Sequence, residues 1–324
     1  MGLNEINLAK FRIDYLSSHI GHTVIGESRL THAGNTKELL FHKWHEQLPE
    51  PLKGKITIIE IPLEGIDDPM QRDIFSREYV MDYARQNFSG EKFFISDLDE
   101  IPSVDQARKL QSVSGLFHFL TPTFYRKANW QLRDKHSKWS RGVCGEIDLN
   151  NFPNAGRFTE LDILNANSGV HLSYLGMDSR LLKEKISSFA HTEIASNPFA
   201  DQSLLDYCDY YRIDHLGRVR TAGFGLFRVN PSNTRDLADA IQAAFPELLD
   251  NGDSVPNTFL RFWASIRLAV WLKAYEDYLT SKQSKNFKQE ILKVSVALQS
   301  IVESLIALGL AARRNLFPNR FGKK

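Results

Sequence analysis

Three carboxylates that follow a short apolar run are the residues of this chain best suited to chemistry. The run Phe93–Ile95 leads into Asp97, Asp99 and Glu100, and Pro102 closes the stretch. Such a run indicates a buried strand, and open α/β sheets hold their ligands beyond the carboxyl ends of strands. Two like charges this close are costly unless a cation lies between them, and oxygen ligands suit Mg²⁺ or Mn²⁺ with a bound phosphate. The stretch therefore points to a metal-bridged phosphate or diphosphate, with a capped turn as the alternative.

Alternating strand-like and helix-like segments must position these carboxylates. Asp68 and Pro69 have the residue types of an N-cap and a first helical position, which predicts a helix from about residue 70 to residue 87. The spacing of strand, helix and strand predicts a βαβ unit and a mostly parallel sheet, hence an α/β fold. Strands are expected at residues 22–27, 56–61, 93–96 and 115–120.

The remainder of the chain changes character twice. Residues 122–167 are aromatic and polar, which predicts loops and antiparallel ribbons, and a strand at 168–174 and a helix at 178–189 follow. The turn-rich residues 229–234 are the best domain boundary. We therefore expect a sheet domain over residues 1–230 and a helical region over residues 231–324, with helices at 234–244, 257–282 and 286–314.

Composition narrows the class of protein. Of the 324 residues, 40 are basic and 39 acidic, a balance that gives no support to a nucleic-acid partner. Two cysteines cannot build a disulfide framework, and neither a signal peptide nor a long apolar span is recognisable, so a cytoplasmic protein is expected. The basic end of the last helix leaves two interpretations: packing or homo-oligomer formation, which we favour, and peripheral contact with an anionic membrane.

Several blocks of sequence share the order of one known family. They are LNEIN at 3–7, VIGESRLTHAG at 24–34, ISDLDEIP at 95–102, GVHLSY at 169–174 and KISSFAHTE at 185–193. Together they resemble glycosyltransferase family 17, the family of the β-1,4-N-acetylglucosaminyltransferase that adds a bisecting GlcNAc to N-glycans. The resemblance implies a GT-A-like fold and inverting transfer of a sugar, with UDP-GlcNAc as the leading donor and a saccharide or glycolipid as the acceptor.

The resemblance also implies roles for the acidic stretch and for a general base. Asp97 and Asp99 would hold Mn²⁺ or Mg²⁺, which stabilises the charge of a departing diphosphate, and Asp97 and Glu100 would contact the donor. Inversion needs one base to take the proton of the acceptor hydroxyl. Glu193 is the first choice, although a solvated surface charge would explain it equally well, and Asp178 is the second choice.

Further donor contacts are predicted in the other blocks. Glu27 lies at the end of the first strand, where a nucleotide usually meets such a sheet, and Thr31 follows shortly after it, although turn capping explains Thr31 equally well. An arginine clamps phosphate bidentately, which makes Arg77 a candidate, with a surface ion pair as the alternative. The remaining predicted donor contacts are Lys37, His171 and His191; a core histidine is the alternative for His171, and a metal ligand for His191.

The sequence leaves more than one interpretation for the acceptor-binding residues and for the class of reaction. Sugar rings stack on aromatic side chains, so Tyr125, Trp130 and Trp139 are predicted to bind the acceptor, with core packing as the alternative. Carboxylates at a strand end are also similar to the first motif of haloacid-dehalogenase-type phosphatases, but Ile101 stands where that family usually has Thr. A metal-dependent phosphatase or phosphotransferase is the first alternative, and a non-catalytic nucleotide- or carbohydrate-binding module is the second.

Overall fold

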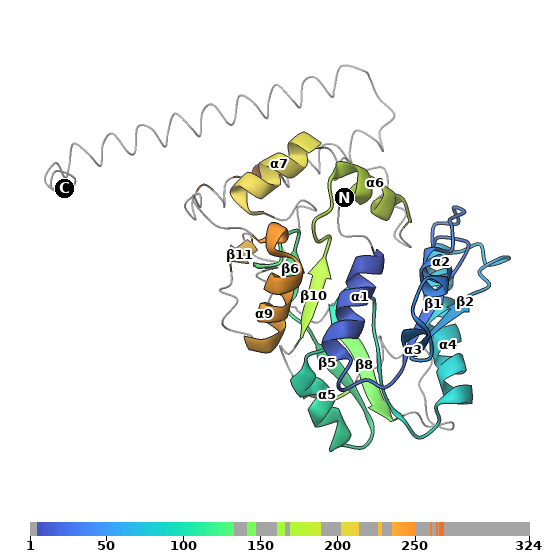
Figure 1. The fold of residues 1–324 in the computed structure, drawn as a ribbon. Helices are drawn as coiled ribbons and strands as arrows, with labels where there is room; N and C mark the ends of the chain where they lie inside the picture. The colour runs from blue at the N-terminus through green and yellow to red at the C-terminus, as the bar shows by residue number, and fades with distance from the viewer. Residues whose placement is uncertain are drawn as a thin grey trace, which may run out of the picture.

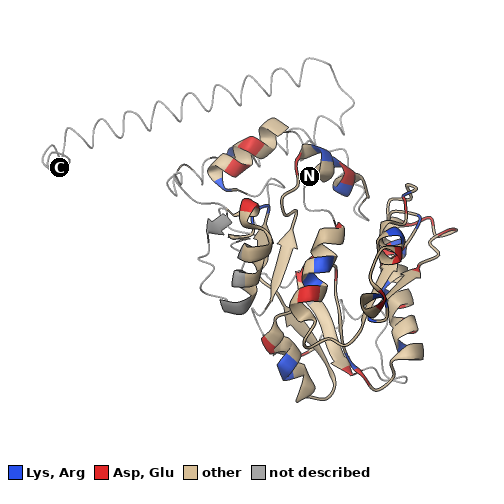
Figure 2. Cartoon of the chain, in the orientation of Figure 1, with Lys and Arg blue, Asp and Glu red and all other residues tan. Residues whose placement is uncertain are grey.

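The computed structural model describes the greater part of the first 250 residues and little beyond them. The described residues are 5–132, 141–146, 161–165, 169–188, 202–213, 226–228, 235–249, 260, 264 and 266–268. They form a mixed α/β structure, in which helices surround three small sheets (Figure 1). Both signs of charge occur on the helices α1 (Glu5–Leu16), α5 (Val104–Gln111) and α6 (Ser179–Ser188) (Figure 2), in keeping with a net charge near zero. Over this part of the chain, none of the helices combines the length and the apolar character that crossing a membrane requires.

The N-terminal elements build a two-stranded parallel sheet with helices around it. They are α1 (Glu5–Leu16), β1 (Thr23–Glu27), α2 (Leu40–Glu46), α3 (Glu50–Lys53), β2 (Ile56–Glu60) and α4 (Pro69–Asn87). β1 pairs with β2 so that Glu27 lies opposite Glu60. The predicted start of α4 is confirmed, because the Asp68 side chain accepts a hydrogen bond from the Gln71 backbone N–H at 2.8 Å and Pro69 is the first helical residue.

A second sheet follows the acidic stretch and is mainly antiparallel. Its strands are ordered β3 (Lys92–Ile95), β8 (Arg141–Glu146), β5 (Leu116–Leu120) and β9 (Ile163–Asn165). β8 is antiparallel to both β3 and β5, and only the pairing of β5 with β9 is parallel. Gly142 allows this packing, because a Cβ atom there would lie 2.0 Å from the buried ring of Phe119.

The third sheet carries the C-terminal end of the acidic stretch. It is ordered β11 (Leu226–Arg228), β7 (Trp130–Leu132), β6 (Thr123–Tyr125), β10 (Val170–Ser173) and β4 (Glu100–Ile101). Gly169 precedes β10 with a φ of +101°, and a Cβ atom there would lie 2.4 Å from the Ile101 carbonyl oxygen, so glycine is needed where β10 meets β4. The other elements are α5 (Val104–Gln111), α6 (Ser179–Ser188), α7 (Gln202–Tyr211), α9 (Arg235–Ala244) and the 3₁₀ helix Pro246–Leu248.

The α/β class and most of the predicted elements are confirmed, but the mostly parallel sheet is wrong. Among the described residues β3 pairs with β8, antiparallel, and not with β2, so the segment β2–α4–β3 does not close a βαβ unit within one sheet. The antiparallel ribbons expected within 122–167 supply that partner strand. The GT-A arrangement and the boundary at residue 230 stay predictions, and the helices expected at 257–282 and 286–314 lie almost entirely outside the described residues.

Candidate active site

The acidic turn, which we define as residues Asp97–Glu100, connects β3 to β4 and is closed by its own hydrogen bonds. The Glu100 N–H donates to the Asp97 carbonyl oxygen at 3.0 Å, and the Asp97 N–H donates to Glu100 Oε2 at 3.1 Å. Ser96 Oγ donates to the Glu100 carbonyl oxygen at 2.8 Å. Glu100 has no exposed surface. Its carboxylate therefore fixes the shape of the turn, while its predicted contact with a donor stays a prediction.

Asp97 faces an arginine of α4. Its Oδ1 accepts a hydrogen bond from Arg77 Nη2 at 2.9 Å, and 42% of the Asp97 side chain is exposed. Arg77 also donates to Asp73, one turn earlier on the same helix. Burial by itself lowers the pKa of Arg77, but the charges of Asp97 and Asp73 outweigh it and raise that pKa. Arg77 is therefore a permanent cation at the exposed edge of the acidic turn.

Asp99 faces two cationic groups from other elements. Its Oδ2 lies 3.4 Å from Lys185 Nζ of α6 and 3.5 Å from His171 Nε2 of β10. Burial opposes the charged form of Asp99, but Lys185 and His171 hold the pKa of this carboxyl well below its usual range. Lys185 Nζ also lies 5.2 Å from the centre of the Tyr174 ring. Side chains of the protein thus offset part of the negative charge of the acidic turn.

A chain of polar contacts joins the acidic turn to the loop after β1. His32 Nδ1 lies 3.5 Å from Asp73 Oδ1, and Asp73 in turn holds Arg77. The pKa of His32 is lowered, mainly by burial, which favours the neutral ring. Arg72 Nη1 donates to the His32 carbonyl oxygen at 2.9 Å. His32 and Asp73 therefore connect this loop to Arg77, and Arg77 connects it to Asp97.

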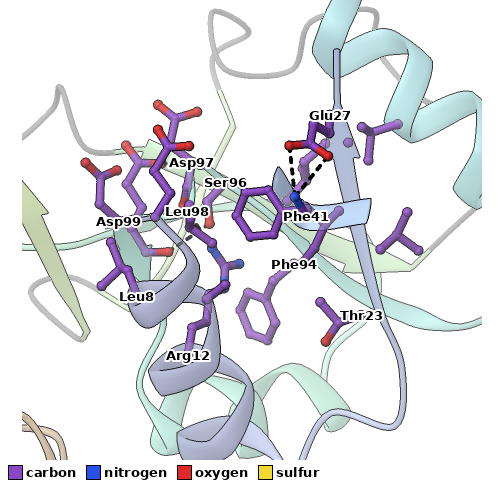
Figure 3. Close-up of a pocket in the computed structure, with 18 of the residues that line it drawn as sticks. Leu8, Arg12, Thr23, Glu27, Phe41, Phe94, Ser96, Asp97, Leu98 and Asp99 are labelled. Carbon is purple, nitrogen blue, oxygen red and sulfur yellow. Dashed lines mark hydrogen bonds between the residues drawn. The ribbon is translucent and has the colours of Figure 1, made fainter. Parts of the chain in front are cut away.

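Most of the residues predicted to bind the donor line one cavity of about 1700 Å³. Figure 3 shows Asp97 and Asp99 on one side of it, with Glu27 and Phe41 across from them. A concave space with a mostly apolar lining and a few charged groups is the usual form of a small-molecule site. The predicted residues that line this cavity are Glu27, Thr31, Lys37, Arg77, Asp97, Asp99, Glu100 and His171.

Comparison with protein families decides the class of the protein. The model of glycosyltransferase family 17 matches residues 2–210, more than half of the chain and all of the elements that line the cavity. The chain belongs to glycosyltransferase family 17. No curated protein and no solved structure matches it. As a glycosyltransferase it acts on a sugar donor and an acceptor, and the geometry above belongs to an enzyme that transfers a glycosyl group.

The donor atoms of the acidic turn fit the divalent cation that the resemblance implies. Carboxylate oxygens are the ligands that Mg²⁺ and Mn²⁺ prefer. In the described part of the chain, no group of three or more His, Cys, Asp or Glu side chains is arranged to hold a metal ion. If a divalent cation binds here, Asp97 and Asp99 would be its carboxylate ligands, and phosphate oxygens and water would take the other positions, as is common for Mg²⁺.

Glu27 is engaged by the start of α2. Its carboxylate accepts hydrogen bonds from the backbone N–H groups of Phe41, at 3.0 and 3.1 Å, and of His42, at 3.1 Å. His42 Nδ1 lies 2.9 Å from Glu27 Oε2, and only 3% of the Glu27 side chain is exposed. Glu27 therefore caps a helix beside the cavity, and its contact with a donor stays a prediction.

Glu27→Ala is expected to lower the free energy of unfolding by about 2–4 kcal/mol, because several buried donors lose a charged acceptor. Chemical denaturation monitored by circular dichroism measures this. Glu60→Ala is the matched control, since Glu60 is the pairing partner of Glu27 but 42% of its side chain is exposed. The control is expected to change stability by no more than about 1 kcal/mol. Equal losses in the two variants would contradict the capping role.

His171 gives the glycosyltransferase a pH-dependent contact. Burial lowers its pKa, but the charge of Asp99 and then its hydrogen bond outweigh burial and raise the pKa above the ordinary value. The stabilisation from the charged pair is therefore complete below about pH 6.5, the unfolded value, and is lost as the pH rises through the raised pKa of the folded state.

The melting temperature of the wild type is expected to exceed that of His171→Gln most strongly below about pH 6.5. The difference is expected to shrink at higher pH. Thermal unfolding of both proteins from about pH 5.5 to pH 9 measures this. The neighbours Asp99, Glu100 and Lys185 are common to the two proteins, so their own titration affects both curves. A difference that does not vary with pH would refute the charged pair.

Other predicted residues lie away from the cavity or are engaged in structure. Tyr125 and Trp130 are buried in a core cluster, at 0% and 4% exposure, which matches the core-packing alternative and leaves no ring face for a sugar. Thr31 Oγ1 accepts from the Asn35 N–H at 3.0 Å and Gly34 has a φ of +92°, as turn capping predicts. Asp178 is exposed and accepts from the Leu181 N–H at the start of α6. Trp139, His191 and Glu193 lie outside the described residues.

Lys185 and Arg12 contact the acidic turn, and neither was predicted as a site residue. Lys185 lies within the block KISSFAHTE, so the resemblance marked the segment but not the lysine. Arg12 follows the block LNEIN and donates from Nη1 to the Asp97 carbonyl oxygen at 2.8 Å. Neither contact has a signal in the local sequence pattern, because the partners lie 86 and 85 residues away.

Proposed function

We propose that this glycosyltransferase moves a sugar, GlcNAc first among the candidates, from a nucleoside-diphosphate donor such as UDP-GlcNAc onto a saccharide hydroxyl with inversion. The acidic turn at the edge of the cavity, flanked by Arg77 and Lys185, is the observation that carries the proposal. Carboxylates and cations alternate there, as a site for a metal–diphosphate unit requires. The family assignment favours glycosyl transfer over the phosphatase alternative.

The described side chains support binding and release of the diphosphate. The guanidinium of Arg77 has planar N–H groups of the kind that phosphate oxygens accept, and Lys185 offers a single ammonium from the other side. When bound, Mn²⁺ or Mg²⁺ at Asp97 and Asp99 would stabilise the negative charge that develops on the diphosphate. Asp73 keeps Arg77 anchored while Asp97 changes partner.

The acceptor side of the reaction rests on fewer residues. Direct displacement needs a base that takes the proton of the attacking hydroxyl. Glu193 is proposed for this role, with Asp178 as the second choice. Trp139 is the remaining aromatic candidate for stacking on a saccharide or glycolipid acceptor, because Tyr125 and Trp130 are buried.

A donor screen tests the proposal. Purified protein is incubated with UDP- and GDP-sugars, with and without Mn²⁺, and release of UDP or GDP is measured alongside binding. Release of UDP from UDP-GlcNAc that depends on Mn²⁺ and on added saccharide is expected. Hydrolysis of a generic phosphate ester is assayed in parallel. Failure of every nucleotide sugar to bind or turn over would refute the proposal, and metal-dependent ester hydrolysis would favour the phosphatase alternative.

A further inference from the structure

The acidic turn is supported from behind by helix α1. Leu98, within the turn, packs against two apolar clusters, and α1 contributes to both of them. Leu8 and Phe11 belong to the cluster that contains Ile101, and Ala9 belongs to the cluster that contains Trp44. Further along the helix, Tyr15 Oη accepts a hydrogen bond from the Val104 N–H at 3.2 Å. One helix therefore touches the turn and the segment that leaves it.

Arg12 is the polar contact of this helix with the turn. Figure 3 shows its side chain extending from α1 towards the backbone beneath Asp97 and Leu98. Its Nη1 donates to the Asp97 carbonyl oxygen at 2.8 Å, the same oxygen that accepts the Glu100 N–H. Burial lowers the pKa of Arg12, while the charges of Glu100, Asp97 and Asp99 oppose that shift. Arg12 is thus a half-buried cation that contacts the backbone of the turn and is close enough for its charge to interact with all three carboxylates.

We infer that Arg12 is a positioning residue, which fixes the acidic turn through the Asp97 carbonyl oxygen and so aims the carboxylates of Asp97 and Asp99 at the donor. The guanidinium offsets part of the repulsion among three carboxylates spaced within four residues, as a permanent cation does. It contacts the backbone of Asp97, so the Asp97 carboxylate remains directed towards Arg77 and the cavity. The inference about the donor rests on the proposed function, whereas the effect on the turn does not.

Hydrogen exchange tests the effect on the turn. Amide exchange in Arg12→Gln is expected to rise in a peptide that covers residues 96–101, because the Asp97 and Glu100 N–H groups lose a fixed partner geometry. Lys10→Gln removes the same charge from an exposed position of α1 and is the matched control. Exchange in that peptide is expected to be unchanged in the control. The inference would be overturned if exchange in Arg12→Gln rose evenly over the whole chain, or if it did not rise in this peptide.

Binding of UDP with Mn²⁺, measured by calorimetry, tests the effect on the donor. Affinity is expected to fall by between about 10- and 100-fold in Arg12→Gln, the usual effect of losing one charge-assisted hydrogen bond. Arg12→Lys is expected to recover part of it, and Lys10→Gln to bind as the wild type does. Equal affinity in folded Arg12→Gln would refute the positioning role. Absence of UDP binding in the wild type would instead remove UDP-sugars from the proposed donors and leave the exchange experiment decisive for Arg12.

Discussion

Asp99→Asn is expected to lower kcat/KM for the nucleotide-sugar donor by about 100-fold or more. Asp99 is the carboxylate of the acidic turn that faces two cationic groups, since its Oδ2 lies within 3.5 Å of both Lys185 and His171 and only 15% of its side chain is exposed. An amide keeps the shape of the side chain but removes its negative charge, so it is a weaker ligand for a divalent cation than the carboxylate. It also leaves Lys185 and His171 without their shared anion. Steady-state kinetics with varied Mn²⁺, together with UDP binding, measure the effect.

The stability of Asp99→Asn must be measured beside its activity. The pKa of Asp99 is depressed, so its contribution to stability is present above the unfolded pKa near 4 and is lost as the pH falls through the folded pKa. At pH 7 the variant therefore unfolds more easily than the wild type, and assays belong well below its melting temperature. Asp105→Asn is the control, because Asp105 is exposed and pairs with Arg108 at 3.2 Å. Wild-type donor affinity and metal dependence in Asp99→Asn would remove Asp99 from the donor site.

The acidic turn shows what the sequence could predict about the site. An apolar run ending in Asp97, Asp99 and Glu100 identifies a strand end with carboxylates from local pattern alone, and the structure places that turn beside the cavity. The partners of those carboxylates are not local. Arg12 and Lys185 come from helices 85 and 86 residues away from their partners, and no periodicity specifies which lysine or arginine will meet a given aspartate.

The sheets and the aromatic residues show the same limit. The run Phe93–Ile95 predicts that β3 exists, but strand propensity does not choose a partner, and β8 pairs with it in the antiparallel direction. Tyr125 and Trp130 were predicted to stack on a sugar or to pack in the core. The sequence could not decide between these, because an aromatic ring suits both environments and only the tertiary fold buries it.

The two cations beside the acidic turn, Arg77 and Lys185, each have a second partner outside the turn. Asp73 holds Arg77, and the Tyr174 ring lies under Lys185. Each cation thus has one partner that belongs to the scaffold and one carboxylate of the acidic turn. A diphosphate that replaced the carboxylate partner would meet a cation already oriented, and the entropy cost of ordering that side chain would be small. This arrangement predicts that donor binding depends on the shape of the cationic side chain in addition to its charge.

Arg77→Lys is therefore expected to raise the KM for the donor by about 10- to 100-fold with a smaller change in kcat. A guanidinium has two terminal nitrogen atoms, and in Arg77 Nη1 donates to Asp73 while Nη2 donates to Asp97. A lysine ammonium keeps the charge but is one point donor, so it cannot hold Asp73 with one nitrogen atom and reach a phosphate oxygen with another. Arg108→Lys, on the exposed surface of α5, is the matched control. A wild-type KM in Arg77→Lys would show that a positive charge alone is enough for donor binding, and would exclude the clamp by Arg77. If kcat and KM are also unchanged in Arg77→Gln, the residue serves only to join α4 to the acidic turn.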